Sequence, residues 1–238
     1  MIRSLALVVV VALLAACGSG PEGSAQGAPT PTPDISGQVI EDFYHWATDP
    51  KSSYASVQTA EVQAAGQNVS LVSDYEFEAG KARATVRGRA AGKQLRFAFI
   101  LIDDFAYLRQ SGNRWQQVAA DALQTSGPAL DAFEFLMART DLEWVGPKDV
   151  DGRQLYELHN SEPLEYRTPA AGIQDPTVTV TQLVVLVTAR GLPMQMQYHM
   201  EIDGELPDGR SYFGEGDVRQ TFRQHGETFG IRPPASFD

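Results

Sequence analysis

Residues 180–202 read VTQLVVLVTARGLPMQMQYHMEI, two apolar runs that flank a Gly-Leu-Pro turn at 191–193. Before the turn, apolar residues alternate with threonines at 177, 179 and 181. After it, they alternate with Gln195, Gln197, His199 and Glu201. A period of two is typical of strands with one buried and one wet face. We therefore predict a hairpin. Its apolar face comprises Val178, Val180, Val184, Leu186, Met194, Met196, Tyr198, Met200 and Ile202.

The same period recurs upstream in three segments, which are separated by Ala79-Gly80 and Ala91-Gly92. Such short turns favour antiparallel neighbours, so we predict a three-stranded meander. The residues expected on its apolar face are Val69, Leu71, Tyr75 and Phe77, then Ala82, Ala84, Val86 and Gly88, then Leu95, Phe97, Phe99 and Leu101.

Helical spacing occurs in two places. The first follows Ser36, a credible N-cap, and the second starts near Ser126, with Pro128 in its first turn. The second would carry Leu130, Phe133, Phe135, Leu136 and Met137. Short strands are expected around Tyr107 and Trp115, a hairpin at Asp151-Gly152, and a surface loop at 161–176. The fold class is thus α+β and dominated by β: a long antiparallel sheet of about ten strands with two or three helices.

The N-terminal segment has the features of an export signal. Arg3 supplies a positive charge, and an unbroken apolar run follows from Leu5 to Leu14, which is too short for a spanning helix of roughly 20 residues. Leu14-Ala15-Ala16-Cys17 then resembles a bacterial lipobox, in which the cysteine is acylated and the signal is cut before it. The alternative is an ordinary secretory signal with a chance cysteine.

Three parts follow from this interpretation. Residues 1–16 are a lipoprotein signal peptide, and residues 17–34 are the lipidated Cys17 and a flexible tether rich in Gly, Pro and Thr. Residues 35–238 form a single domain. We expect an extracytoplasmic protein, anchored by its acyl chains to the outer face of the bacterial cell membrane or elsewhere in the envelope.

Composition excludes several classes of function. The chain has 19 Lys and Arg against 30 Asp and Glu, a net charge of −11, which argues against a nucleic-acid partner. A single cysteine among 238 residues excludes disulfide frameworks and thiolate zinc sites. Nucleophile-elbow, Walker, H-E-x-x-H and dinucleotide fingerprints are missing from the sequence. We expect no enzyme, metal or cofactor.

The apolar face of the predicted sheet is the candidate site. Small inward residues between 82 and 88 leave room, and Met194, Met196 and Met200 form a flexible stripe that suits an apolar ligand. Ordinary core packing is the alternative. The candidate cavity-lining residues are Leu71, Tyr75, Phe77, Ala84, Val86, Leu95, Phe97, Phe99, Phe133, Met137, Val184, Leu186, Met194, Met196, Tyr198 and Met200.

The order of these features resembles a known family. The chain resembles the LppX/LprG lipoproteins of the LolA/LolB-like superfamily in the order of its parts. These are a lipobox, a tether, a first helix, a meander, a Tyr107…Gly112…Trp115 hairpin, the run at 180–202 and a strand ending at Phe229 to Pro234. The resemblance implies a curved half-barrel of ten or eleven strands around helices, with a cavity for lipid acyl chains. It transfers no defined ligand-binding residues.

Two hypotheses follow. The first is a monomeric, membrane-anchored lipoprotein that binds a lipid or other amphiphile for carriage across the envelope. The second is an anchored interaction module with a filled core, whose partner is a transporter or cell-wall component. Arg83, Arg87 and Arg89 form a basic stripe on the outer face, which either meets an anionic group or is a solvated face that balances nearby carboxylates.

Overall fold

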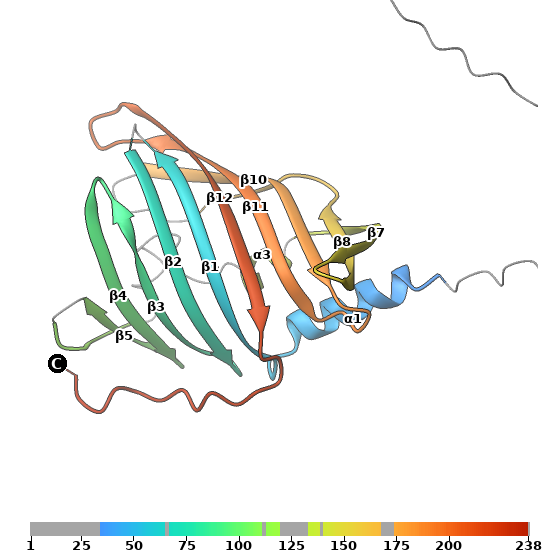
Figure 1. Ribbon diagram of the computed structural model, residues 1–238. Coiled ribbons are helices and arrows are strands. Elements are labelled where there is room, and N and C mark those ends of the chain that lie inside the picture. The colour runs from blue at the N-terminus through green and yellow to red at the C-terminus, as the bar shows by residue number, and fades with distance from the viewer. Residues whose placement is uncertain are drawn as a thin grey trace, which may run out of the picture. The chain divides into compact units, whose positions relative to one another are not determined.

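The computed structural model describes residues 34–64, 67–110, 113–119, 133–138, 140–167 and 174–237, and all of them belong to one compact unit. In these residues twelve strands form one open, curled antiparallel sheet, where about ten or eleven were expected (Figure 1). Helix α1 spans Ser36–Thr48, and α3 is a short helix at Phe133–Met137. The start predicted for the second helix, near Ser126, lies outside the described residues. The described part therefore has one full-length helix where two or three were predicted.

The strands divide into two consecutive groups. The first comprises β1 (Ser53–Ala64), β2 (Gln67–Glu78), β3 (Lys81–Ala90), β4 (Lys93–Ile102), β5 (Phe105–Gln110) and β6 (Gln116–Ala119). The second comprises β7 (Leu142–Val150), β8 (Arg153–Asn160), β9 (Leu164–Arg167), β10 (Gln174–Val187), β11 (Pro193–Glu205) and β12 (Ser211–Arg223). The sheet order is β6-β5-β4-β3-β2-β1-β12-β11-β10-β8-β7, and β9 pairs with β10. The pairing of β1 with β12 joins the groups.

The predicted meander is confirmed by β2, β3 and β4, whose register places Tyr75, Ala84 and Phe99 side by side. Strand β1, which lies at the centre of the sheet, was not predicted from the sequence. Its inward positions include Ser56 and Gln58, so its polar residues do not alternate with apolar ones. The loop predicted at 161–176 is also wrong in part, because β9 lies within it and β10 begins at Gln174.

Helix α1 packs against the turn of the β10–β11 hairpin (Figure 1). Gly191 has a φ of +69°, and a Cβ there would lie 2.3 Å from the backbone nitrogen of Phe43. Only glycine allows both this backbone conformation and this close approach. The Gly-Leu-Pro turn at 191–193 is therefore also the surface against which α1 packs.

The start of α1 differs from the prediction. Ile35 occupies the N-cap position, and Ser36 is the first helical residue. Asp34 holds the end instead, since its Oδ1 accepts hydrogen bonds from the Ser36 amide at 3.0 Å and the Ser36 hydroxyl at 2.6 Å. Further along, the Tyr44 hydroxyl donates to Thr140 O and accepts from the Leu142 amide, both at 2.8 Å, which ties α1 to the start of β7.

The C-terminal segment covers part of the outer face. The final strand ends at Arg223, and residues 224–237 continue as an irregular tail along one end of the sheet, where a strand up to Pro234 was predicted (Figure 1). Glu78 Oε2 accepts hydrogen bonds from the amides of Phe229 and Gly230. The tail then buries Ile231 in a small second core with Ile100 and Tyr107.

Candidate functional site

The inner face of the sheet carries one continuous apolar core. It extends from β5 and β4 through β1 and β12 to β10 and β8, and both described helices contribute to it. Val39 and Phe43 come from α1, and Phe133, Leu136 and Met137 come from α3, all five being buried. The hydrophobic effect favours such burial by about 25 cal/mol per Å² of apolar surface.

Aromatic rings gather where the two helices meet the sheet. The Phe133 ring lies edge-on at 4.9 Å from Phe222, 5.7 Å from Trp46 and 6.0 Å from Tyr54, measured between centroids. Tyr54 also stacks on Phe77 at 5.3 Å. Edge-to-face pairs of this kind add roughly 0.5–1.5 kcal/mol each beyond their buried area. Phe133 is therefore the contact through which α3 is held to the inner face.

Most of the candidate cavity residues lie on this inner face. Ten belong to the buried core: Leu71, Tyr75, Ala84, Val86, Phe99, Phe133, Met137, Met196, Tyr198 and Met200. Phe77 and Phe97 are partly buried and pack against it. Leu95 has the inward register but is 37% exposed, because it lies near the end of its strand, beyond the core. Cys17 lies outside the described residues.

Three candidates do not line the inner face, because bulges interrupt the β10–β11 ladder. The register shifts between Val180 and Gln182, so the inward positions change from even to odd numbers. Leu183, Val185 and Val187 are then in the core, while Val184 and Leu186 point to the outer side. A second shift after Leu186 leaves Met194 unpaired, partly exposed and outside the core cluster.

A sequence signal for the first bulge existed. Thr181 and Gln182 are adjacent polar residues inside an alternating run, and two polar neighbours in succession break the period of two. Because every residue from Leu183 to Val187 is apolar, the sequence does not indicate which alternate set faces inward after the bulge. The sequence analysis therefore missed Leu183, Val185 and Val187 as inward residues.

A polar group crosses the middle of the inner face, and the sequence analysis missed it as well. Gln58 lies directly opposite Ser73 on β2 and Gln220 on β12. Gln220 Nε2 donates to Ser56 Oγ at 2.9 Å, and both side chains are fully buried. These groups interrupt an otherwise apolar surface, and buried polar atoms cost free energy unless they are hydrogen-bonded.

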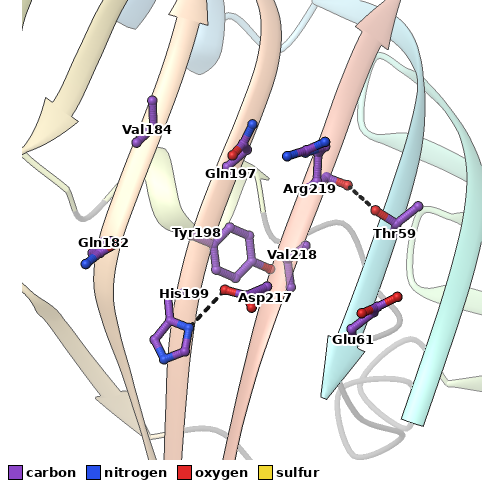
Figure 2. A pocket seen from close by; sticks show the side chains of 10 residues that line it. All are labelled: Thr59, Glu61, Gln182, Val184, Gln197, Tyr198, His199, Asp217, Val218 and Arg219. Carbon is purple, nitrogen blue, oxygen red and sulfur yellow. Dashed lines mark hydrogen bonds and ion pairs between the residues drawn. The ribbon is translucent and has the colours of Figure 1, made fainter. Parts of the chain in front are cut away.

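The outer face carries a shallow pocket of about 370 Å³ across β10, β11, β12 and β1 (Figure 2). His199 Nδ1 and Asp217 Oδ1 lie 2.9 Å apart, and Thr59 Oγ1 donates to Arg219 O at 3.4 Å. Figure 2 shows Val184 and Gln182 on its rim. The Thr59 hydroxyl bonds to backbone rather than to His199, so the pocket offers polar contacts but no activated nucleophile.

Burial and pairing shift several pKa values, but none of these groups forms a catalytic set. Burial raises the pKa of the Tyr44 hydroxyl. The hydrogen bond from Lys148 holds the pKa of Glu157 below its usual value, with a further contribution from His159. Burial lowers the pKa of His225, whose Nε2 donates to Pro193 O at 2.7 Å. Each shift has a structural cause close by, so none indicates catalysis by itself.

Neither a metal centre nor a spanning helix occurs in the part of the chain that the structure describes. Within those ranges no three or more His, Cys, Asp or Glu side chains could together hold a metal ion. No helix there is both long and apolar enough to cross a membrane. The inner apolar face is therefore the candidate site among the described residues.

Comparisons with known proteins give distant similarities. No protein-family model matches the chain, and no curated protein matches it. Among solved structures it is similar to MucB in complex with periplasmic MucA (15% identity, TM-score 0.31, covering 84% of this chain and 60% of that one). The chain thus spans less than two thirds of the MucB chain.

Two further solved structures are similar at still lower identity. One is a LolA superfamily protein from Nitrosomonas europaea (9% identity, TM-score 0.30, covering 79% of this chain and 94% of that one). The other is a DUF1329 family protein from Desulfovibrio piger (10% identity, TM-score 0.27, covering 84% and 96%). Neither of these two structures is described as an LppX/LprG lipoprotein.

Proposed function

We propose that this chain is an extracytoplasmic lipoprotein whose curled sheet takes the apolar part of a lipid or other amphiphile against its inner face. The observation that carries the proposal is the continuous apolar inner face of an open twelve-stranded sheet. A sheet this long must cover its apolar face, and the two described helices contribute only five buried apolar side chains to it.

The chemistry of the face suits a loosely specified ligand. Met137, Met196 and Met200 supply flexible, polarisable side chains, and Ala84 is a small side chain between Tyr75 and Phe99. An acyl chain would bind through buried apolar area, less the free energy needed to order it. The inner face needs no nucleophile or metal for such binding, which is consistent with a carrier rather than an enzyme.

The N-terminal segment supports the location. Leu14 to Cys17 matches a lipobox, so Cys17 would carry the acyl chains and residues 18–34 would tether the domain that begins near Ile35. As a flexible coil, the tether spans on the order of 20–25 Å. The protein would then remain near the outer face of the cell membrane, where a transporter could supply or receive its ligand.

One experiment tests ligand binding directly. Residues 34–238, which keep the Asp34 cap of α1, are purified without detergent, extracted with organic solvent and examined for lipid by mass spectrometry. We expect bound lipid at close to one molecule per chain. Ala84→Leu should lower this ratio by filling the inner face, while Thr85→Leu on the outer face of the same strand should leave it unchanged. An empty extract, with no thermal shift on adding phospholipid or glycolipid, refutes the proposal.

A second function is favoured by one observation. Val86, Leu158, Val185 and Met196 are completely inaccessible to solvent, as in a filled core. A filled core would leave an anchored interaction module, whose partner would be an envelope protein such as a transporter. The same extraction separates the two functions, because the module would contain no lipid and would retain its stability after delipidation.

A further inference from the structure

One hairpin carries a net positive charge in an otherwise acidic chain. From Ala79 to Ile102 the sequence contains six Lys and Arg and no Asp or Glu. The rest of the chain then has 13 Lys and Arg against 30 Asp and Glu, a net charge of −17. These 24 residues are β3, β4 and their turns, on the side of the sheet away from α1 (Figure 1). An acidic protein therefore presents one strongly basic element.

Near the base of this hairpin Arg83 is paired with a carboxylate, but the arginines toward the tip are not firmly paired. Arg83 forms an ion pair with Glu76 on the neighbouring strand. Arg87 reaches Asp74 only at 3.5 Å, and both side chains are well exposed, so this contact contributes little. Arg89 and Arg96 have no ion pair with any described residue. The tip thus keeps its positive charge.

Register brings these guanidinium groups together. Arg87 lies directly opposite Arg96, and Arg89 lies opposite Gln94, all on the outer face. Directly opposed residues have Cβ atoms roughly 4.5–5.5 Å apart, a distance at which like charges are destabilising. An anion placed between the two arginines would relieve that repulsion. Guanidinium groups also bind phosphate oxygens in a bidentate manner.

A groove of about 720 Å³ lies among these residues. Arg87, Arg89 and Arg96 line it together with the hydroxyls of Ser70 and Thr85. Val72 and Leu95 add apolar surface, and Leu95 is one of the large apolar side chains that the fold leaves exposed. Cationic, hydroxyl and apolar groups in one groove match the boundary between lipid headgroups and acyl chains better than they match a free inorganic ion.

The tip of the hairpin is also shaped to approach a flat surface. Residues 91–96 are all exposed, on both faces of the sheet, and they comprise Ala91, Gly92, Lys93, Gln94, Leu95 and Arg96. The small residues of the turn leave no bulky side chain to hold a surface away from the cations. The nearest carboxylates, Asp74 and Glu76, lie on the adjacent β2 toward the base of the hairpin, while Glu61, Glu215 and Asp217 lie on β1 and β12, two or more strands away.

We propose that the β3–β4 hairpin is a docking surface for the phosphate headgroups of an anionic phospholipid membrane. Arg87, Arg89 and Arg96 bind the phosphates, and Val72, on the same outer face, adds apolar surface beside them. The uneven distribution of charge then orients the protein, because the remainder of the chain, at −17, is repelled by anionic headgroups while this hairpin, with six Lys and Arg, is attracted. Docking of this kind is independent of whether the inner face holds a lipid.

The test uses the full chain reconstituted into vesicles of phosphatidylcholine, with or without one third phosphatidylglycerol. Hydrogen–deuterium exchange is followed in peptides that cover residues 87–96. We expect exchange to slow at least two-fold on the anionic vesicles alone, and the slowing to disappear as salt rises from 0.05 to 0.5 M. Each arginine near an anionic surface contributes about five-fold to the docking equilibrium, so R87Q/R89Q/R96Q should weaken docking on the order of 100-fold.

A matched variant controls for net charge. R153Q/R190Q/R223Q removes the same three positive charges from exposed positions outside the hairpin and should dock like the unsubstituted chain. Both variants replace exposed side chains, and their thermal midpoints are measured alongside. Equal exchange on the two kinds of vesicle overturns the proposal, as does equal weakening by both triple variants.

Two further arms distinguish other anions. If 10 mM inorganic phosphate slows exchange in the hairpin as strongly as the anionic vesicles do, the groove is a phosphate site and membrane docking is refuted. If a poly-glutamate peptide slows exchange and the vesicles do not, the partner is an acidic protein segment and the proposal also fails. Slowing by the anionic vesicles alone supports it.

Discussion

Substitution of Gly191 gives the most direct test of how α1 packs against the turn between β10 and β11. In Gly191→Ala, the new Cβ would lie 2.3 Å from Phe43 N and 2.5 Å from Asp42 C, where ordinary contacts begin at 3.4 Å. Both atoms belong to the α1 backbone, so the helix must move by about 1 Å or the turn must open. The residue must also keep a φ of +69°, which costs a non-glycine residue roughly 1–2 kcal/mol.

Gly209 provides a matched control in the next turn. Thr188 N donates to Leu192 O and Gly191 N donates to Thr188 O, and residues 206, 209 and 210 repeat the same two hydrogen bonds. Gly209 has a φ of +78°, but no atom lies within 4 Å of its added Cβ. Gly209→Ala therefore carries the backbone cost alone, and the difference between the two variants isolates the contact with α1.

The difference should be large enough to measure easily. Overpacking against backbone costs about 1–3 kcal/mol, so Gly191→Ala should lose roughly 2–5 kcal/mol and Gly209→Ala roughly 1–2 kcal/mol. Urea unfolding can be followed by tryptophan fluorescence, and one of the three tryptophans, Trp46, belongs to α1 and packs on Phe133 and Tyr54. The thermal midpoint should fall by about 2–4 °C per kcal/mol. Equal losses in the two variants, within 0.5 kcal/mol, would refute the seating of α1 on this turn.

Three further predictions concern the aromatic cluster, a half-buried histidine and the anchor. Phe133→Ala should cost about 3–5 kcal/mol in urea unfolding, because it empties the space between both helices and β12; a loss below 1 kcal/mol would show that α3 does not pack there. His225 has a lowered pKa in the folded state, so its contribution to stability is present above about pH 6.5 and is lost as pH falls toward the folded value. Unfolding free energies at pH 7.5 and 5.5 should differ less in His225→Gln than in the parent chain, and an unchanged difference contradicts this. Finally, Cys17→Ser should abolish the incorporation of labelled palmitate in a bacterial host; retained label would exclude this cysteine as the lipidation site.

Part of the candidate site could be predicted from alternation alone. Tyr75, Ala84, Val86 and Phe99 lie on the inner face as expected, because the ladders between β2, β3 and β4 run without a register shift. Where a ladder keeps its register, every second residue continues to face the same side, and the sequence pattern is sufficient.

Other positions depended on contacts that the local pattern does not contain. Val184 and Leu186 point outward because β10 bulges against β11, and the period of two alone does not say which half of the strand changes face. Alternation correctly predicts the side of the sheet that Leu95 faces, but Leu95 is exposed because it lies beyond the core. Strand β1 was not predicted because polar residues, Ser56 and Gln58, occupy its inward positions. Their burial results from the pairing of β1 with β2 and β12, which the sequence of β1 alone does not indicate.

Local sequence patterns are enough to predict the β-dominated class, the hairpin around Gly191, the meander, and an export signal that ends before Cys17. These depend on short-range rules: the period of a pleated strand, the freedom of glycine at a turn, and the length of an apolar run. Three features became visible only in the three-dimensional structure. Strand β1 joins the two halves of the sheet, the C-terminal tail covers Ile100 and Tyr107, and Arg87 lies opposite Arg96. The physical reason is that strand pairing and burial depend on contacts between residues far apart in the chain. The alternation of residues within one segment contains no information about those contacts.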